Sequence, residues 1–252
     1  MKHLENFIVE EKIKLSTNNF LLALKSPVSL SEIKSGQFVN VEVKDVADRI
    51  LRRPISVHDV DKEKNILYLV VQMVGKATKK LSLAKKGDEI SIIFPLGNGF
   101  EIKGNKPLLI GGGVGVAPLF LLAKEFKRQG VIPSILIGAR TNEQLFLTNR
   151  YNAVGNLSIS TEDGSVGEKG LVIENSVLNN EFDVVYCCGP TPMMRAISIW
   201  AKEKNIECYL SLENRMACGI GACLCCVNED SNGHNVCVCT QGPVFNAVDI
   251  KL

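Results

Sequence analysis

The chain has 252 residues, of which 46% are hydrophobic and 22% are charged, a balance that is ordinary for a globular protein. Its net charge of +2 is too small to indicate a nucleic acid or an anionic membrane as partner. No apolar run approaches the roughly 20 residues that a membrane span needs, and the length favours two domains with or without a small module.

The first hundred residues predict a small antiparallel β-barrel. Short β-rich or alternating segments are separated by turn signals, and six strands at this spacing are typical of a barrel. A short helix is expected at 77–84, and the turn-rich segment 95–100 marks the expected end of a domain over 1–100. The predicted strands are 7–15, 19–26, 36–43, 55–60, 66–74 and 88–96.

The middle of the chain predicts a different architecture. Residues 106–130 indicate a buried strand, a glycine loop and an amphipathic helix. Strands that alternate with helices imply a parallel sheet, so we expect an α/β domain over 101–207. A loop-rich tail over 208–252 would then be stabilised mostly by a metal. The further strands expected are 134–140, 157–163, 183–190 and 207–214, with a helix at 192–205.

Four cysteines near the C-terminus carry the clearest chemical signal. The first three, Cys218, Cys223 and Cys226, are spaced C-x4-C-x2-C, and Cys239 follows after twelve intervening residues. This is the plant-type spacing for a [2Fe–2S] cluster. Glycines between the first two ligands would let the backbone curl and aim N–H groups at the sulfurs. A chain that holds such a cluster is expected to transfer single electrons.

Other uses of the cysteines remain open at this point. A structural zinc is the main alternative, although zinc sites usually pair cysteines in two separate knuckles. Cys225 and Cys237 lie beside ligand positions and compete for them. The N-terminus has no apolar signal region, so we expect a cytoplasmic protein with reduced thiols rather than disulfides. The three histidines show no metal-pair spacing, which argues against histidine acid–base chemistry.

Two turns predict a nucleotide site at the carboxyl ends of the parallel strands. The segment 111–118, GGGVGVAP, joins a strand to a helix, where a pyrophosphate can approach the backbone. A Cys-Gly-Pro element ends a later strand of the same sheet. Packing alone also explains glycines at such turns. The candidate residues are Gly112, Gly113, Gly115, Cys188, Gly189 and Pro190.

The barrel contains candidate phosphate ligands. Arginine offers a bidentate fork for phosphate, and Arg53 is followed by Pro54, Ile55 and Ser56. A second turn, 75–78, opens the predicted helix and would offer backbone N–H groups. The alternatives are a solvated basic turn and an ordinary helix cap.

Taken together, the motifs resemble a known family. RPIS, GGGVGVAP and CGP, in this order, are similar to the ferredoxin–NADP reductase superfamily, in which a barrel binds flavin and an α/β domain binds a nicotinamide nucleotide. With LRRPIS, PLGNGF, STEDGSVGEKG, CGPTPMM, MACGIGACLCC and CTQGPVF, the chain resembles the electron transfer subunits of type B dihydroorotate dehydrogenases over nearly its whole length.

The resemblance implies roles for particular residues. Residues 53–56 would contact FAD phosphate and ribitol, and 70–72 would line the isoalloxazine. Ala77 stands where the family usually has glycine, which puts a close backbone–phosphate approach in doubt. The C-x-x-G-P-V-F match supports Cys239 as the fourth ligand. The implied FAD residues are Arg53, Pro54, Ile55, Ser56, Val70, Val71, Gln72, Ala77 and Thr78.

The resemblance also implies the function. Electrons would pass from the FMN of a dihydroorotate-oxidising catalytic partner through the [2Fe–2S] cluster and FAD to NAD+, in pyrimidine biosynthesis. The assembly would be a heterotetramer of two subunits of each kind, and no catalytic side chain is assigned here. The alternatives are a subunit for ferredoxin:NADP transhydrogenation, whose relatives often have aspartate in place of Cys218, a subunit for sulfide-dependent electron transfer, and a non-enzymatic sensor of nucleotide and zinc.

Two finer expectations concern the nucleotide and the partner. Glu162 and Asp163 end a predicted strand, where carboxylates would favour NAD over NADP by accepting bonds from a ribose hydroxyl. Arg140 opposes this, because it would favour a phosphate. The apolar segment 242–245 beside the fourth ligand is expected to form part of a docking interface, or else to pack the tail onto its own domain.

Overall fold

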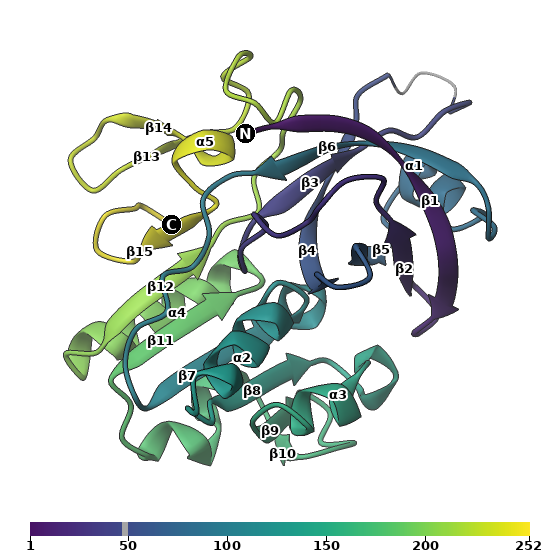
Figure 1. Ribbon diagram of the computed structural model, residues 1–252. Coiled ribbons are helices and arrows are strands. Elements are labelled where there is room, and N and C mark those ends of the chain that lie inside the picture. Colours follow the sequence, from purple (N-terminus) through teal and green to yellow (C-terminus); the bar gives the residue numbers. More distant parts are fainter. Residues whose placement is uncertain (47–49) are drawn as a thin grey trace.

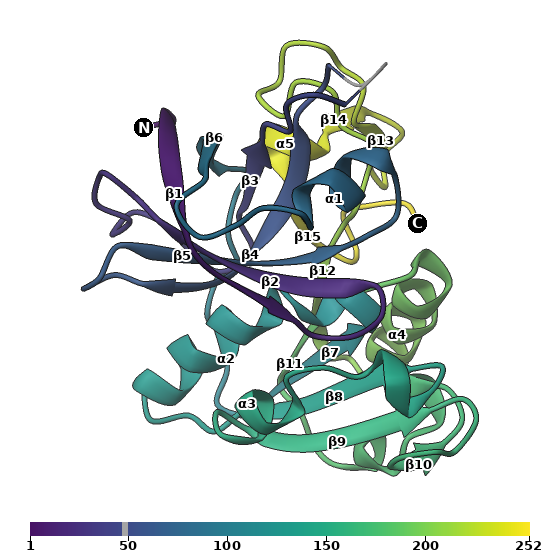
Figure 2. The same cartoon turned by 90° about the vertical axis from the view of Figure 1, so that its right-hand side faces the viewer.

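The computed structural model describes residues 1–46 and 50–252. Within these residues, a closed β-barrel lies over a twisted sheet flanked by helices, and the C-terminal tail lies beside the barrel, above one edge of the sheet (Figure 1). The view in Figure 2 shows α2 lying between the barrel and the sheet. Both expected architectures, the antiparallel barrel and the parallel-sheet α/β unit, are confirmed.

Six antiparallel strands close the barrel in the order β1-β2-β5-β4-β3-β6 within the described ranges. Alternate residues of β6 point inward, as the alternating sequence requires. Phe7 and Phe94 meet edge to face at 5.0 Å in the barrel core. Helix α1, Lys76–Leu81, lies in the chain between β5 and β6, the last strand of the barrel. The strands are β1 His3–Lys14, β2 Asn19–Lys25, β3 Phe38–Val41, β4 Arg53–Asp61, β5 Ile66–Gln72 and β6 Glu89–Leu96.

The second unit is a sheet in the order β10-β9-β8-β7-β11-β12-β15. Its neighbours from β10 to β12 are parallel, and β15 pairs antiparallel to β12. Register places the carboxyl ends of β7, β8 and β11 side by side, so the turns after them meet at one edge. The strands are β7 Pro107–Gly112, β8 Ser134–Ala139, β9 Asn156–Thr161, β10 Glu168–Lys169, β11 Val184–Cys188, β12 Glu207–Ser211 and β15 Val244–Asn246.

Helices cover the sheet. Helix α2 buries one apolar face, including Phe120 and Phe126, and ends with basic residues that suit a helix C-terminus. The α-helices are α2 Leu119–Arg128, α3 Thr148–Asn152, α4 Thr191–Glu203 and α5 Val238–Gln241, and the 3-10 helices are Gly113–Val116, Asn142–Gln144, Val172–Glu174 and Ser176–Asn179. None of the helices in the described ranges is long and apolar enough to cross a membrane.

The contact between barrel and sheet is formed by α2 against β4. His58 is buried and stacks on Phe120 at 4.8 Å, with its Nδ1 2.9 Å from the carbonyl of Ala117. Beside it, Lys124 forms an ion pair with Asp59 at 2.5 Å. Burial lowers the pKa of His58 to about 4, so the imidazole is neutral near pH 7. This histidine is therefore part of the packing between the two units.

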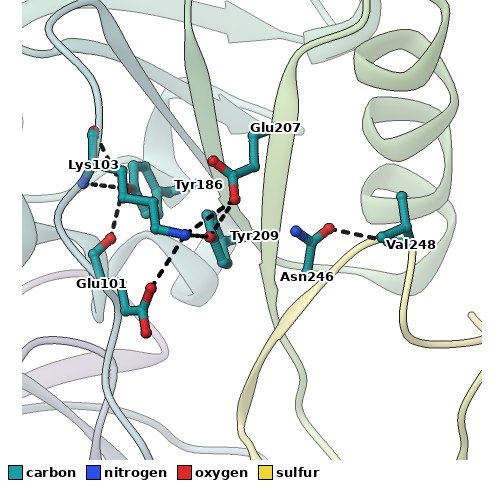
Figure 3. A network of polar contacts seen from close by, with 7 residues as sticks. All are labelled: Glu101, Lys103, Tyr186, Glu207, Tyr209, Asn246 and Val248. Carbon is teal, nitrogen blue, oxygen red and sulfur yellow. Dashed lines mark hydrogen bonds and ion pairs between the residues drawn. The ribbon is translucent and has the colours of Figure 1, made fainter.

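The segment that leaves the barrel is anchored by polar contacts, which Figure 3 shows. The Lys103 amine lies 3.2 Å from the carboxylates of both Glu101 and Glu207 and also contacts the Tyr209 hydroxyl. The Tyr186 hydroxyl accepts from the Lys103 N–H at 2.9 Å and donates to the carbonyl of Glu101 at 2.7 Å. Glu207 begins β12, and Tyr186 and Tyr209 are the central residues of β11 and β12, so these contacts do not involve the glycine turns after the strands. They fix the connection between the two units.

The tail has more regular structure than the sequence predicts. It contains a hairpin, β13 Val227–Glu229 with β14 Asn235–Cys237, followed by α5 and β15. Val238 and Ile250 are buried in the same apolar cluster as Leu210 of β12, so packing as well as any metal stabilises the tail. The domain boundary expected at 207/208 falls inside β12.

The segment 242–245 is not a free docking surface. Gly242, Pro243 and Val244 are buried, and Phe245 is half-buried where β15 pairs with β12. The prediction that these residues form part of a docking interface is therefore wrong, because they pack the tail onto its own sheet.

Candidate cofactor sites

A cavity of about 410 Å³ opens between the barrel, the turn after β7 and the segment after β12. Seven of the nine residues predicted from the barrel line it. Strand β4 contributes a run that begins with the Arg53 guanidinium and ends with the Ser56 hydroxyl, and β5 contributes an apolar wall. The predicted lining residues are Arg53, Pro54, Ile55, Ser56, Val70, Gln72 and Thr78.

Two predicted residues do not line this cavity. Val71 is buried in the barrel core, because successive side chains of β5 point to opposite faces. Ala77 is buried against the barrel, and Thr78 occupies the cavity wall instead. The Thr78 Oγ1 accepts from the N–H groups of Val74 at 3.0 Å and Gly75 at 3.1 Å, so this hydroxyl also closes the turn before α1.

A large part of the cavity wall consists of residues that were not predicted from the sequence. Five of the missed residues form one segment directly after β12, and a sixth, Pro243, comes directly before β15. Since ligands bind at the carboxyl ends of parallel strands, the position at the carboxyl end of the last predicted strand, 207–214, was a signal for the first group. Glu213 is an exposed carboxylate at the rim of this cavity. The missed residues are Phe38, Val74, Val114, Ala117, Leu212, Glu213, Asn214, Arg215, Met216 and Pro243.

A second cavity, about 340 Å³, lies at the carboxyl ends of β7, β8 and β9. Of the six predicted nucleotide residues, Gly112, Gly113 and Pro190 line it. Gly113 has a φ of +55°, and a Cβ added there would meet nothing within 4 Å. Its neighbour Val114 lines the barrel cavity, so this one turn separates the two cavities.

The other three predicted residues lie beneath the turn. A Cβ on Gly115 would come within 2.6 Å of the Cys188 carbonyl oxygen and the Gly189 Cα, so Gly115 allows the two turns to pack together. Cys188 is fully buried, and burial raises the pKa of its thiol. These residues therefore support the shape of the cavity and do not form its surface.

Arg140 and Glu162 both line the second cavity. Asp163 does not, and its carboxylate accepts bonds from the Ser165 hydroxyl at 2.6 Å and from the Ser165 N–H at 3.0 Å. These bonds lower the pKa of Asp163. Of the two carboxylates considered for ribose, only Glu162 is placed to meet a nucleotide in this cavity.

The four predicted cluster ligands, hereafter the cluster cysteines, lie in one region of the tail as two pairs. Cys218 lies near Cys223, and Cys226 lies near Cys239, whose backbone N–H donates to the Cys226 Sγ at 3.4 Å. Within residues 1–46 and 50–252, no group of three or more metal-binding side chains is close enough to hold an ion as it stands. The structure thus brings the cysteines together pairwise.

The donor set nonetheless suits an iron–sulfur cluster. The N–H groups of Ile220 and Ala222 point at the Cys218 Sγ at 3.4 and 3.3 Å. Burial raises the pKa of Cys218, but these backbone bonds outweigh it and lower the pKa to about 6, which favours the thiolate that binds metal. Cys239 is buried and its N–H donates to the Cys226 Sγ at 3.4 Å.

The competing cysteines are placed differently. Cys225 is exposed, and Cys237 is half-buried at the N-terminus of α5. Neither side chain takes part in the paired contacts of the cluster cysteines that the structure shows in its described residues. This placement supports Cys239 over Cys237 as the fourth ligand.

The fold and the two cavities define an FAD-binding reductase with an additional cysteine-rich tail. A family model described as an oxidoreductase FAD-binding domain matches residues 6–100. A second, described as the iron–sulfur cluster binding domain of dihydroorotate dehydrogenase B, matches residues 213–251.

Full-length relatives give the family. A protein of Fusobacterium nucleatum named dihydroorotate dehydrogenase B (NAD(+)), electron transfer subunit, is 37% identical over 259 residues, covering 99% of each chain. A Bacillus cereus protein of the same name is 37% identical over 263 residues, covering all of both chains. The chain belongs to the family of dihydroorotate dehydrogenase B electron transfer subunits.

Solved structures agree with the fold. The structure of an NADH-dependent reduced ferredoxin–NADP oxidoreductase superposes with a TM-score of 0.87 at 32% identity, covering 97% of this chain and 89% of that one. An Amycolatopsis cytochrome P450 reductase superposes with a TM-score of 0.71 at 22% identity, over 81% of this chain and 67% of its own, and shows the shared fold alone.

Proposed function

We propose that this chain passes electrons from a catalytic subunit that oxidises dihydroorotate to NAD+, in pyrimidine biosynthesis. One observation carries the proposal: the turn 111–118 lies between the two cavities, and Met216, in the wall of the barrel cavity, is only two residues before Cys218. The sites for flavin, nicotinamide and cluster are therefore contiguous along a short stretch of the molecule.

Each cofactor has residues that would hold it. The barrel cavity would bind FAD, with Arg53 and Ser56 meeting its phosphate and ribitol and the face of β5 meeting the flavin ring. The second cavity would bind NAD, with Gly112 and Gly113 next to the pyrophosphate. When bound, the cluster supplies one-electron transfer and the flavin supplies exchange between single electrons and hydride. We assign residues 1–100, 101–207 and 208–252 to the flavin, nicotinamide and cluster units, with most of β12 and all of β15 passing from the third range into the nicotinamide sheet.

A reconstitution experiment tests the function. The isolated chain should carry FAD and one [2Fe–2S] cluster, and it should reduce artificial acceptors with NADH. It should not oxidise dihydroorotate until the FMN-containing catalytic subunit is added. Oxidation of dihydroorotate by this chain alone, with no partner co-purified, would refute its assignment as an electron transfer subunit.

The proposal extends to assembly and location. We infer a heterotetramer with two subunits of each kind, which the mass of the purified complex would measure. The nine cysteines are all free, which fits the reducing conditions of the cytoplasm. Fractionation of cells, with the chain followed by antibody, tests that location.

The likeness to the ferredoxin–NADP oxidoreductase structure favours a second candidate, a subunit that serves a ferredoxin-type partner. The two candidates predict different partners in a pull-down from native extract. A co-purifying FMN protein that oxidises dihydroorotate supports the first candidate. A zinc-binding sensor would be colourless, whereas flavin and iron–sulfur would give a red-brown protein.

A further inference from the structure

The side chain of Asn40 joins the barrel to the loop that carries the first cluster cysteine. Asn40 lies on β3 and is 1% exposed, and its Nδ2 donates to the carbonyl oxygen of Cys218 at 3.0 Å. In the barrel it pairs with Pro54 of β4 on one side and with Ile93 of β6 on the other. Pro54, the neighbour of Asn40 on β4, lines the barrel cavity. Asn40 therefore contacts the cluster loop from the strand next to the one that lines this cavity.

The cluster loop approaches this asparagine closely. Gly219 has a φ of +69°, and a Cβ added to it would lie 2.9 Å from the Asn40 Nδ2. Only glycine combines this backbone conformation with this approach. The loop therefore rests directly on the barrel wall at the first ligand.

The hydrogen bond from Asn40 fixes the orientation of the Cys218–Gly219 peptide, which leads to the N–H groups that surround the Cys218 Sγ. The carbonyl it holds belongs to Cys218, whose Sγ accepts from the N–H groups of Ile220 and Ala222 in the same turn. Rotation of the Cys218–Gly219 peptide would move both donors relative to the sulfur. Hydrogen bonds to the sulfurs are one of the protein's means of tuning an iron–sulfur cluster.

A second asparagine holds the segment after the fourth ligand. The Asn98 Nδ2 donates to the carbonyls of Gln241 at 2.8 Å and Val244 at 3.1 Å, and its Oδ1 accepts from the Val244 N–H at 3.1 Å. Its backbone N–H donates to the carbonyl of Gly242 at 2.6 Å. Gln241 ends α5, the helix that carries Cys239, so residue 98 at the barrel exit holds this helix from its C-terminal side.

We propose that Asn40 and Asn98 are positioning residues through which the flavin barrel holds the first and fourth ligand segments of the cluster. They set the conformation of the ligand loop and the rate of electron exchange between cluster and flavin. They do not affect hydride exchange between nicotinamide and flavin, because that site lies on the other side of the turn 111–118. This inference rests on the proposed function.

The test compares Asn40→Ala and Asn98→Ala with Asn6→Ala in the full chain loaded with FAD and cluster. Asn6 is a suitable control because it lies on the same barrel and is exposed, and the one hydrogen bond of its side chain among the described residues is to Glu89 at 3.5 Å. Iron and flavin contents, the electron paramagnetic resonance spectrum of the reduced cluster, and stopped-flow rates of flavin and cluster reduction by NADH are measured.

Both test variants should keep wild-type flavin content and reduce their flavin with NADH within about twofold of wild type. Their cluster spectra should change, and cluster reduction should slow by about tenfold, the loss typical when a partner of a metal ligand is removed. Loss of iron with flavin retained supports the proposal as well, because it also shows that the ligand segments are no longer held.

Wild-type spectra and cluster rates in both variants would overturn the proposal. Loss of flavin and iron together from Asn40→Ala would show that Asn40 stabilises the barrel as a whole. The cluster spectrum and cluster reduction rate of Asn98→Ala, a change at an exposed residue, then decide whether the barrel holds the cluster. If wild-type protein binds no flavin, or its cluster is not reduced by NADH, the proposed function fails instead.

Discussion

Arg53→Ala should weaken FAD binding, whereas the neighbouring Arg52→Ala should not. The structure separates these two arginines. Arg52 donates to the Ser91 carbonyl at 2.8 Å and to the Ser91 Oγ at 2.9 Å, and it lies 3.6 Å from Glu42, so its guanidinium is engaged on the barrel. Arg53 lines the barrel cavity and has no carboxylate partner among residues 1–46 and 50–252.

The size of the effect follows from the bonds that the guanidinium would make. A hydrogen bond to a charged group contributes about 1.5–3 kcal/mol. One lost bond to a flavin phosphate therefore raises the Kd for FAD by roughly ten- to more than a hundredfold. Arg52→Ala loses charge-assisted bonds to Ser91 and the ion pair with Glu42, which all lie on the barrel, so it lowers the free energy of unfolding instead.

Titration of the flavin-free protein with FAD, followed by flavin fluorescence, measures both variants. Flavin content after gel filtration gives an independent check, and urea unfolding of the same samples reports stability. A wild-type Kd for Arg53→Ala would refute the assignment of this residue to the flavin. An equal loss of affinity in Arg52→Ala would show that the effect comes from the barrel and not from the cavity.

Three further predictions concern the cluster, the barrel–sheet contact and the nucleotide. Serine in place of any cluster cysteine should lower iron content sharply, whereas Cys225→Ser and Cys237→Ser should retain iron; iron loss from Cys237→Ser and none from Cys239→Ser would reassign the fourth ligand. Burial lowers the pKa of His58 from 6.5 to about 4. As the pH falls below 6.5, the unfolded chain therefore binds a proton at this histidine that the folded chain does not bind. The free energy of unfolding should then fall by roughly 3 kcal/mol by pH 4. Urea unfolding across this range measures the loss, and an unchanged profile in His58→Gln would contradict the cause. NADH should be preferred over NADPH in kcat/KM, and Glu162→Gln should reduce that preference several-fold; a wild-type preference for NADPH would contradict the role of this carboxylate.

Local patterns in the sequence were sufficient for much of the fold. The predicted strand 88–96 corresponds to β6, Glu89–Leu96, and the predicted strand 19–26 to β2, Asn19–Lys25. Alternation along a strand reflects which face is buried, and this information lies within a few residues. The short elements β10, β13 and β15 were not predicted, because such strands form through pairing with distant segments.

The candidate sites divide in the same way. The cysteine spacing is a property of one short stretch, so the cluster type could be predicted without the fold. The arginine of the R-P-x-S motif could also be chosen by its position in the sequence. By contrast, Pro243 and the segment 212–216 reach the barrel cavity only because β12 ends and β15 begins beside it.

The sequence by itself determined the chemistry of the ligands, the order of the units and most of the strands, because each depends on residues that are close along the chain. Only the tertiary structure decided which residues of each motif meet a cavity. It placed Gly115 under the turn with Cys188, turned Val71 into the barrel and set Asn40 against the cluster loop. These outcomes depend on contacts between segments far apart in the chain, where close packing leaves each side chain one set of neighbours.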